Sequence, residues 1–256
     1  ANLVWLDINS DTYVIDLESI KNAITDNTKA IVLVHLYGLM CPMEEIVDYC
    51  RERNIIVIED CAQSLGASIK DKKAGSFGDI SIYSFHANKC ITTLGEGGMI
   101  TVNDDALAEQ IYLLRHNGVT TFKKRNHNEY WKPAMSNIVS TEQGVWPYNF
   151  SLGEVQCAVG YKLMDRLDSL NAERNKRADI FKKELSKFKE LVFQKVPKNY
   201  YHVYHCLVVY FDANYSNGTR DQFMDRLHTK YGIQCIVQNC PLYRYDLFKV
   251  NNFHDN

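Results

Sequence analysis

Four polar side chains in the first hundred residues have the types and the spacing of a chemical site. Asp60 and Gln63 follow one apolar run, and Ser84 and Lys89 follow the next. If both runs are strands of a parallel sheet, their carboxyl ends lie at one edge, which is where open sheets bind ligands. A lysine beyond a strand end, among small and hydroxylated residues, suits a nucleophilic amine, although most such lysines are ordinary loop residues.

A lysine paired with a carboxylate is the combination that pyridoxal phosphate requires. The amine forms a Schiff base with the cofactor, and an aspartate on the pyridine nitrogen lets the ring accept electrons. The cationic ring keeps that aspartate ionised, because a nearby opposite charge favours the charged form. A lone aspartate after a strand is usually a turn or cap residue, so the role of Asp60 is inferred together with Gln63, Ser84 and Lys89.

The elements that must position these residues are strands separated by an amphipathic segment. Ala30–His35 and Ile55–Ile58 are near-continuous apolar runs, and Met43–Arg53 between them has helical spacing. Such a strand–helix–strand unit is the elementary piece of a parallel sheet, so we expect an α/β fold. We also expect strands at Leu3–Ile8, Ile80–Phe85 and Met99–Val102, and helices at Leu17–Ile24 and from Asn103-Asp104 through Leu114.

The second half of the chain has a different organisation. Periodicity is absent from His116 to Pro147, which indicates a long loop. Ser151 opens a helical stretch, one long helix or two in tandem, that continues through Leu185. We place a domain boundary near residue 165, with domains at 1–165 and 166–256. The second domain is expected to hold strands at Tyr201–Phe211 and Ile233–Val237 and a helix at Arg220–Lys230.

Composition excludes several classes of protein. The 256 residues carry 29 basic and 31 acidic side chains, a net charge of −2, so no basic excess indicates nucleic acid. No apolar run is long enough to span a bilayer, and no membrane partner is expected. Eight cysteines without a Cys-x-x-Cys pair favour reduced thiols in the cytoplasm.

Two other kinds of site are disfavoured. No Gly-x-Gly-x-x-Gly follows an expected strand, as a nicotinamide-binding protein would require. His202 and His205 are three apart on an expected strand and therefore point to opposite faces. We expect them to be partly buried histidines, and we expect no metal site.

Five motifs occur in order and resemble those of one enzyme family. The chain is similar to the nucleotide-sugar aminotransferases of the DegT/DnrJ/EryC1/StrS family, which are fold type I pyridoxal-phosphate enzymes. The resemblance implies an aspartate-aminotransferase-like large domain, a mostly parallel mixed sheet flanked by helices, and a smaller C-terminal α+β domain. The motifs are Val34-His-Leu-Tyr-Gly38, Ile58-Glu-Asp-Cys-Ala-Gln-Ser64, Gly75-Ser-Phe-Gly-Asp79, Tyr83-Ser-Phe-His-Ala-Asn-Lys89 and Gly95-Glu-Gly-Gly98.

The resemblance implies a role for each of the four polar residues. Lys89 matches the Schiff-base lysine, which also moves a proton between substrate and cofactor, and Asp60 matches the partner of the pyridine nitrogen. Gln63 matches the residue beside the cofactor ring and its phenolic oxygen. Ser84 matches a phosphate ligand. The glycines of Gly95–Gly98 fit a tight return into the next strand, with a backbone role only.

Two more residues acquire roles in the same way. Asn149 matches an asparagine that reaches the cofactor phosphate of the neighbouring subunit, which implies a homodimer with shared active sites. His86 stands where the family often has an aromatic residue or histidine, and either lines the sugar site or packs.

The implied reaction moves an amino group from glutamate to the keto carbon of a nucleotide-linked deoxysugar, in polysaccharide or glycan precursor biosynthesis. Some relatives carry a histidine in place of the lysine and act as sugar dehydratases, so Lys89 favours aminotransfer. A pyridoxal-phosphate-dependent dehydratase and a non-catalytic pyridoxal-phosphate-binding relative are the alternatives.

The chain departs from the family pattern at both ends and near the substrate. It begins at a strand from the middle of the family's large domain, without the earlier helix N-terminus that binds the cofactor phosphate. It stops soon after Cys240-Pro-Leu-Tyr243, where relatives continue. We therefore expect a piece of a longer protein, and poor cofactor binding by residues 1–256 alone. Gln238-Asn239 replaces a common His-Tyr pair, which leaves the sugar preference open, as does loop 119–147.

Overall fold

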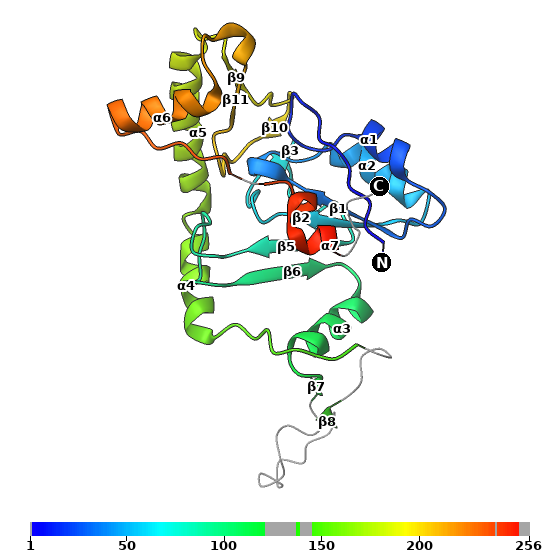
Figure 1. The fold of residues 1–256 in the computed structure, drawn as a ribbon. Coiled ribbons are helices and arrows are strands. Elements are labelled where there is room, and N and C mark those ends of the chain that lie inside the picture. The colour runs from blue at the N-terminus through cyan, green and yellow to red at the C-terminus, as the bar shows by residue number, and fades with distance from the viewer. Residues whose placement is uncertain (1, 121–136, 139–144, 239, 251–256) are drawn as a thin grey trace.

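The central element of the fold is a four-stranded sheet in the order β1-β2-β5-β6 (Figure 1). A computed structural model describes residues 2–120, 137–138, 145–238 and 240–250 of the chain. β1, β2 and β5 are parallel, which confirms the expected parallel unit, and β6 runs antiparallel to β5. The strands are β1 (Ala30–Val34), β2 (Ile56–Asp60), β5 (Ile80–Ser84) and β6 (Gly98–Val102).

β6 is antiparallel because the chain folds back beside β5 without a crossover. The ladder continues beyond β5, where the Phe85 N–H donates to the Gly97 carbonyl (2.8 Å) and the Ala87 N–H to the Gly95 carbonyl (2.7 Å). A Cβ on Gly97 would collide with the Thr93 hydroxyl. The glycine-rich motif therefore has the backbone role predicted for it.

The two faces of the sheet have different surroundings. Leu33 and Val57 point to one face, where they are buried with Met43 and Ile46 of α2 (Met43–Arg51). On the other face, the side chains of Val32, Ile56 and Ile100 are 57%, 48% and 50% exposed. This alternation follows from the period of two in a strand, and it puts consecutive residues of β2 on opposite faces.

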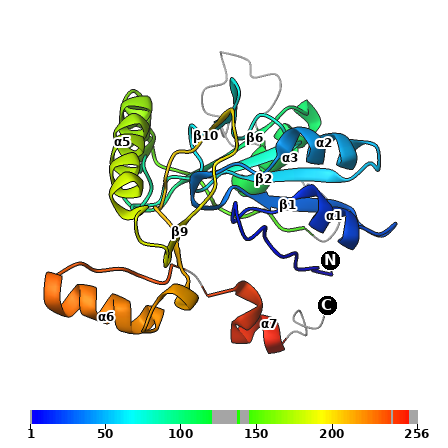
Figure 2. The ribbon, with the colours of Figure 1, turned by 90° about the horizontal axis from the view of Figure 1, so that it is seen from above.

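The helices lie on two sides of the molecule. In Figures 1 and 2, α5 stands on one side, and α1, α2 and α3 lie toward the other. None of the described helices is both long and apolar enough to cross a membrane. Besides α2, the helices are α1 (Leu17–Ala23), α3 (Asp105–Arg115), α4 (Glu154–Met164), α5 (Leu167–Leu185), α6 (Arg220–Tyr231) and α7 (Asp246–Val250), with 3-10 turns η1 (Leu36–Gly38), η2 (Ala213–Tyr215) and η3 (Leu242–Arg244).

Local sequence explains where several helices begin. Asp16 accepts a hydrogen bond from the Ser19 N–H at the start of α1, and Asp104 accepts one from the Leu107 N–H at the start of α3. Thr219 and Gln222 form a reciprocal capping box at α6. The helical stretch after Ser151 forms two helices, α4 and α5. The predicted domain boundary near residue 165 falls between them and stays a prediction.

Three short sheets complete the fold. One sheet has the order β10-β3-β4, the second pairs β9 with β11, and the third pairs β7 with β8; all pairs are antiparallel. Their bounds are β3 (Ser68–Ile69), β4 (Lys72–Lys73), β7 (Val119–Thr120), β8 (Asn137–Ile138), β9 (Leu191–Phe193), β10 (Tyr200–Tyr201) and β11 (Val209–Phe211).

Two predicted strands are wrong, and a third is a strand only at its two ends. Leu3–Ile8 pairs with no strand in the described part of the chain, and its Trp5 ring packs edge-on against Phe248, 5.3 Å between centroids. Ile233–Val237 also has no strand partner among the described residues, and its apolar side chains are exposed. Tyr201–Phe211 is interrupted, because its middle part leaves the strand to pack on η1. Most of the predicted loop 119–147 lies outside the described residues.

The contact between η1 and the interrupted strand predicts an effect of substituting Gly38. Its φ is +105°, and an added Cβ would lie 3.0 Å from the backbone nitrogens of Tyr204 and His205. Gly38→Ala is expected to lower the free energy of unfolding by about 2–4 kcal/mol, from positive-φ strain plus overpacking. Gly232→Ala is the matched control, because Gly232 has φ +66° and nothing within 4 Å of its Cβ position. Gly232→Ala should lower the free energy of unfolding, measured with urea, by only about 1–2 kcal/mol. Equal losses of stability in the two variants would contradict the close contact between Gly38 and residues 204–205.

Candidate active site

The carboxyl ends of two neighbouring strands carry the first two predicted site residues. Asp60 is the last residue of β2 and Ser84 the last of β5, and the register places Asp60 beside Ile82. Since Ile82 and Ser84 are two residues apart, Asp60 and Ser84 lie on the same face of the sheet. This is the exposed face described above. The structure therefore brings these two side chains to one edge.

The backbone and side chain of Asp60 are both held in place. Its carbonyl accepts a hydrogen bond from the N–H of His35, the residue after β1 (3.1 Å). The next residue, Cys61, donates its N–H to the Ile82 carbonyl of β5 (2.9 Å). The carboxylate Oδ1 accepts the Ala62 N–H at 2.9 Å. Asp60 is half-buried. Its carboxylate consequently has a fixed position at the sheet edge.

Gln63 connects β2 to the turn that follows β1. Its Oε1 accepts the Tyr37 N–H at 2.6 Å. The same turn accepts two bonds from the interrupted strand, from the Val203 N–H to the Gly38 carbonyl (3.1 Å) and from the Cys206 N–H to the Tyr37 carbonyl (3.4 Å). Gln63 is thus placed where two distant segments meet.

Ser84, His86 and Lys89 belong to one tight turn after β5. The Ser84 hydroxyl accepts the His86 N–H (3.3 Å), and the Lys89 N–H donates to the His86 carbonyl (2.9 Å). The His86 ring accepts the Asn88 N–H at Nδ1 (3.1 Å), and its Nε2 lies 3.5 Å from a carboxylate oxygen of Glu96. These contacts give His86 a part in shaping the turn. Its contact with a sugar stays a prediction.

A segment that sequence reasoning missed lies near Lys89. Burial, and then the positive charges of Lys89 and Arg174, lower the pKa of His205 to about 4. The Arg174 guanidinium of α5 also donates to the carbonyls of Tyr204 (3.1 Å) and His205 (3.4 Å), which fixes this segment. No motif in the sequence marks residues 203–206, so only the folded chain reveals that they approach the lysine.

Asn149 lies apart from this group. Its backbone bridges that of His116, and its Oδ1 accepts the Ser151 N–H at 3.3 Å. The neighbouring Phe150 N–H donates to the Arg115 carbonyl at the end of α3. These contacts tie Asn149, which is exposed, to α3 and not to the strand ends. Its reach into a neighbouring subunit stays a prediction.

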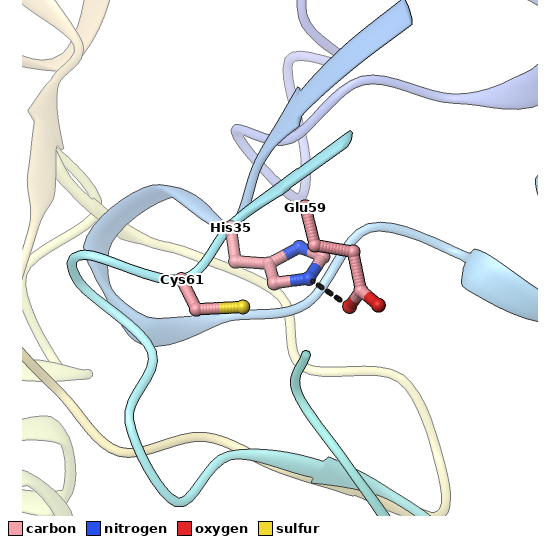
Figure 3. A group of neighbouring side chains, drawn as sticks. All are labelled: His35, Glu59 and Cys61. Atoms are coloured by element: carbon pink, nitrogen blue, oxygen red, sulfur yellow. Dashed lines mark hydrogen bonds and ion pairs between the residues drawn. The ribbon is translucent and has the colours of Figure 1, made fainter. Parts of the chain in front are cut away.

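A glutamate and a histidine form a buried pair, and the glutamate directly precedes Asp60 in β2 (Figure 3). The Glu59 Oε2 is 3.0 Å from His35 Nε2, and both side chains are fully buried. Oε2 also accepts the Gly75 N–H (2.9 Å), and Oε1 accepts those of Phe77 (2.7 Å) and Gly78 (2.6 Å). Four donors thus converge on one carboxylate.

The protonation states of this pair follow from its hydrogen bonds. Burial by itself raises the pKa of Glu59, but the bonds from His35, Gly78 and Gly75 outweigh it, and the pKa lies below its usual value. His35 Nδ1 accepts the Cys41 N–H at 3.2 Å, so Nε2 carries the hydrogen that Glu59 accepts. The hydrogen bonds therefore assign a carboxylate and a neutral imidazole.

This pair does not have the chemistry of a metal site. His35, Glu59 and Cys61 are the one set of possible metal ligands close enough together in the described part of the chain. Both ring nitrogens and both carboxylate oxygens are already engaged. Burial, and then the charge of Glu59, raise the pKa of the Cys61 thiol. A thiol that resists ionisation is a poor ligand.

Comparison with known proteins assigns the class of protein. The model of the DegT/DnrJ/EryC1/StrS aminotransferase family matches residues 1–255, and the chain belongs to that family. The fold is that of the aminotransferases. The X-ray structure of the aminotransferase from Psychrobacter cryohalolentis matches with a TM-score of 0.88 and 28% identity, over 100% of this chain and 66% of that one.

Two curated relatives illustrate the range of the family. GDP-perosamine synthase of Escherichia coli O157:H7 is 32% identical over 95% of this chain and 62% of its own length. The UDP-4-amino-4,6-dideoxy-N-acetyl-beta-L-altrosamine transaminase of Campylobacter jejuni is 31% identical over 97% of this chain and 62% of its own length. The chain therefore spans about three fifths of the length of each of these two relatives.

Two histidines with lowered pKa values, His202 and His205, predict an acid-sensitive fold. Burial, and then the charge of Lys182, lower the pKa of His202 from 6.5 to about 3. Between these pH values the unfolded chain binds more protons than the folded one, so stability falls as pH falls through that window. The lowered pKa of His205 acts in the same direction.

Melting temperatures measured from pH 7 to about pH 4 test this expectation. His202→Gln should flatten the decline, because glutamine does not titrate. His228→Gln on α6 is the control, since His228 is exposed and should leave the decline as it is. A decline that is equally steep in His202→Gln would contradict the assignment.

Proposed function

We propose that the protein containing this chain is a pyridoxal-phosphate-dependent aminotransferase that acts on a nucleotide-linked keto-deoxysugar. Glutamate is the proposed amino donor, and the product is a precursor of a polysaccharide or glycan. The observation that carries the proposal is that two neighbouring parallel strands end at Asp60 and Ser84, with Gln63 and Lys89 in the turns that follow them, in a chain of an aminotransferase family. The named relatives with nucleotide-sugar substrates support the substrate class.

The residues present fit the chemical groups of pyridoxal phosphate. Asp60 offers a fixed, half-buried carboxylate for the pyridine nitrogen. Ser84 offers a hydroxyl for the phosphate, and Lys89 an amine for the aldehyde carbon. When bound, the cofactor supplies an electron sink for the carbon that loses or gains the amino group.

Each residue then has a physical task. Asp60 keeps a positive charge on the ring nitrogen, because an ion pair stabilises the protonated form. Gln63, which is anchored on the Tyr37 N–H, borders the ring beside its phenolic oxygen. Lys89 holds the cofactor and then moves a proton at the reacting carbon. The neutral ring of His205 adds no like charge beside Lys89.

The assembly and the compartment are also proposed. Asn149 of one subunit would reach the phosphate of the other in a homodimer, a role that its exposed position permits. His86 would border the sugar. All eight cysteines are free thiols, which supports a reducing compartment such as the cytoplasm.

Removing the amine tests the proposal directly. Lys89→Ala is expected to lose the visible absorption band of the bound cofactor and to lower turnover by about 10²- to 10⁴-fold or more, because the amine that is proposed to hold the cofactor and to move the proton is removed. Conversion of glutamate to 2-oxoglutarate, with a panel of nucleotide-linked 3-keto and 4-keto deoxysugars, is the assay. Lys195→Ala is the control, since Lys195 is a surface residue paired with Asp11 and should behave as wild type. Full turnover by Lys89→Ala would overturn the proposal.

Asp60→Asn tests the pyridine contact. The amide cannot balance a charged ring nitrogen, so we expect turnover to fall by about 10²- to 10³-fold while the fold persists. Circular dichroism checks the fold, and the glutamate half-reaction gives the rate. Asp48→Asn, on the exposed side of α2, is the control. An Asp60→Asn rate within about twofold of wild type would exclude this role.

A further inference from the structure

Three segments that carry or contact the proposed site residues are tied to a single side chain, that of Glu59: β2 itself, the end of β1 and the turn before β5. It bonds to His35 at the end of β1 and to the turn 75–78 that precedes β5. It belongs to β2, next to Asp60. We infer that Glu59, held by His35, is a positioning residue for the cofactor, an inference that rests on the proposed function.

The first connection runs to Asp60. Glu59 points into the core and Asp60 to the exposed face, because side chains alternate along a strand. Any shift of the Glu59 backbone therefore moves Asp60 as well. A second link joins Asp60 to the end of β1, because the His35 N–H donates to the Asp60 carbonyl.

The second connection runs to Gln63. η1 begins immediately after His35, and its Tyr37 N–H holds the Gln63 amide oxygen at 2.6 Å. Because His35 is fixed at both ring nitrogens, by Glu59 and by the Cys41 N–H, the direction in which η1 leaves β1 is fixed too.

The third connection runs to β5 and Ser84. The Gly75 carbonyl accepts the Ser81 hydroxyl at 3.0 Å, and the Ala74 carbonyl accepts the Tyr83 hydroxyl at 3.3 Å. A Cβ on Gly75 would collide with the Tyr83 hydroxyl. The turn that donates to Glu59 is therefore packed on the strand that ends at Ser84. One buried anion thus holds three neighbouring segments in register.

A positioning role differs from a purely structural one in what a variant changes. His35→Leu removes the donor to Glu59, and Glu59→Gln removes the charge. Both should weaken pyridoxal phosphate binding by about tenfold or more and shift the pH midpoint of its visible absorption band. His35→Gln should keep the cofactor affinity within about threefold of wild type and should keep the wild-type pH midpoint, because the glutamine amide nitrogen can donate to Glu59.

Ile46→Ala is the matched control for lost stability. Ile46 is fully buried in α2 on the same side of the sheet, and its truncation should cost about 2–5 kcal/mol. It should keep the wild-type cofactor affinity and pH midpoint. Cofactor binding by Ile46→Ala that is as weak as that of His35→Leu would overturn the inference, and so would wild-type binding by His35→Leu.

The outcomes separate this inference from the proposed function. If the whole wild-type protein that contains this chain forms no absorption band with pyridoxal phosphate, both are overturned. A wild-type band that bleaches with glutamate, together with unchanged affinity and midpoint in His35→Leu and Glu59→Gln, overturns only the positioning role. If Glu59→Gln does not fold, the comparison of His35→Leu with His35→Gln decides.

Discussion

A carboxylate that is cut off from water must be surrounded by donors, and Glu59 imposes this constraint on the fold. The penalty for burying an unpaired charge is large, yet here the side chain is fully buried and the bonds it accepts lower its pKa. Three of its four donors are backbone N–H groups, which cannot be supplied unless the turn 75–78 wraps around it. The fourth, His35, fixes the end of the neighbouring strand.

The consequence of this constraint appears one residue further along β2. Glu59 satisfies the needs of the core, and Asp60 is left on the opposite face with a carboxylate directed to the sheet edge. Of two successive acidic residues, Glu59 is therefore part of the core and Asp60 is available to the proposed site. The same division recurs in β5, where Tyr83 bonds to the turn before it and Ser84 begins the polar turn of Lys89.

Much of this arrangement was predictable from sequence periodicity, because burial dictates it. The apolar runs predict β1, β2 and β5, and the amphipathic spacing predicts α2. A parallel sheet then brings Asp60 and Ser84 to one edge. The role of Glu59 was less visible. His35 and Glu59 are polar residues next to buried runs, a signal of an internal pair, but only the fold shows that Gly75–Gly78 completes it.

What could not be predicted depends on contacts between distant segments. Residues 203–206 lie within a predicted strand, yet the bonds that they accept from Arg174 and donate to the carbonyls of η1 hold them outside any strand and near Lys89. Leu3–Ile8 has the composition of a strand, but composition cannot show whether a neighbouring strand is available to pair with it.

In the proposed function, Lys89 is the amine that holds pyridoxal phosphate at this strand edge. Borohydride reduction of the cofactor-loaded protein, followed by peptide mapping, tests it most directly, since reduction fixes the cofactor on the amine that binds it. We expect a phosphopyridoxyl group on the peptide that contains Lys89 and on no other. A label on a different lysine, or no label on a protein that is saturated with the cofactor, would contradict it.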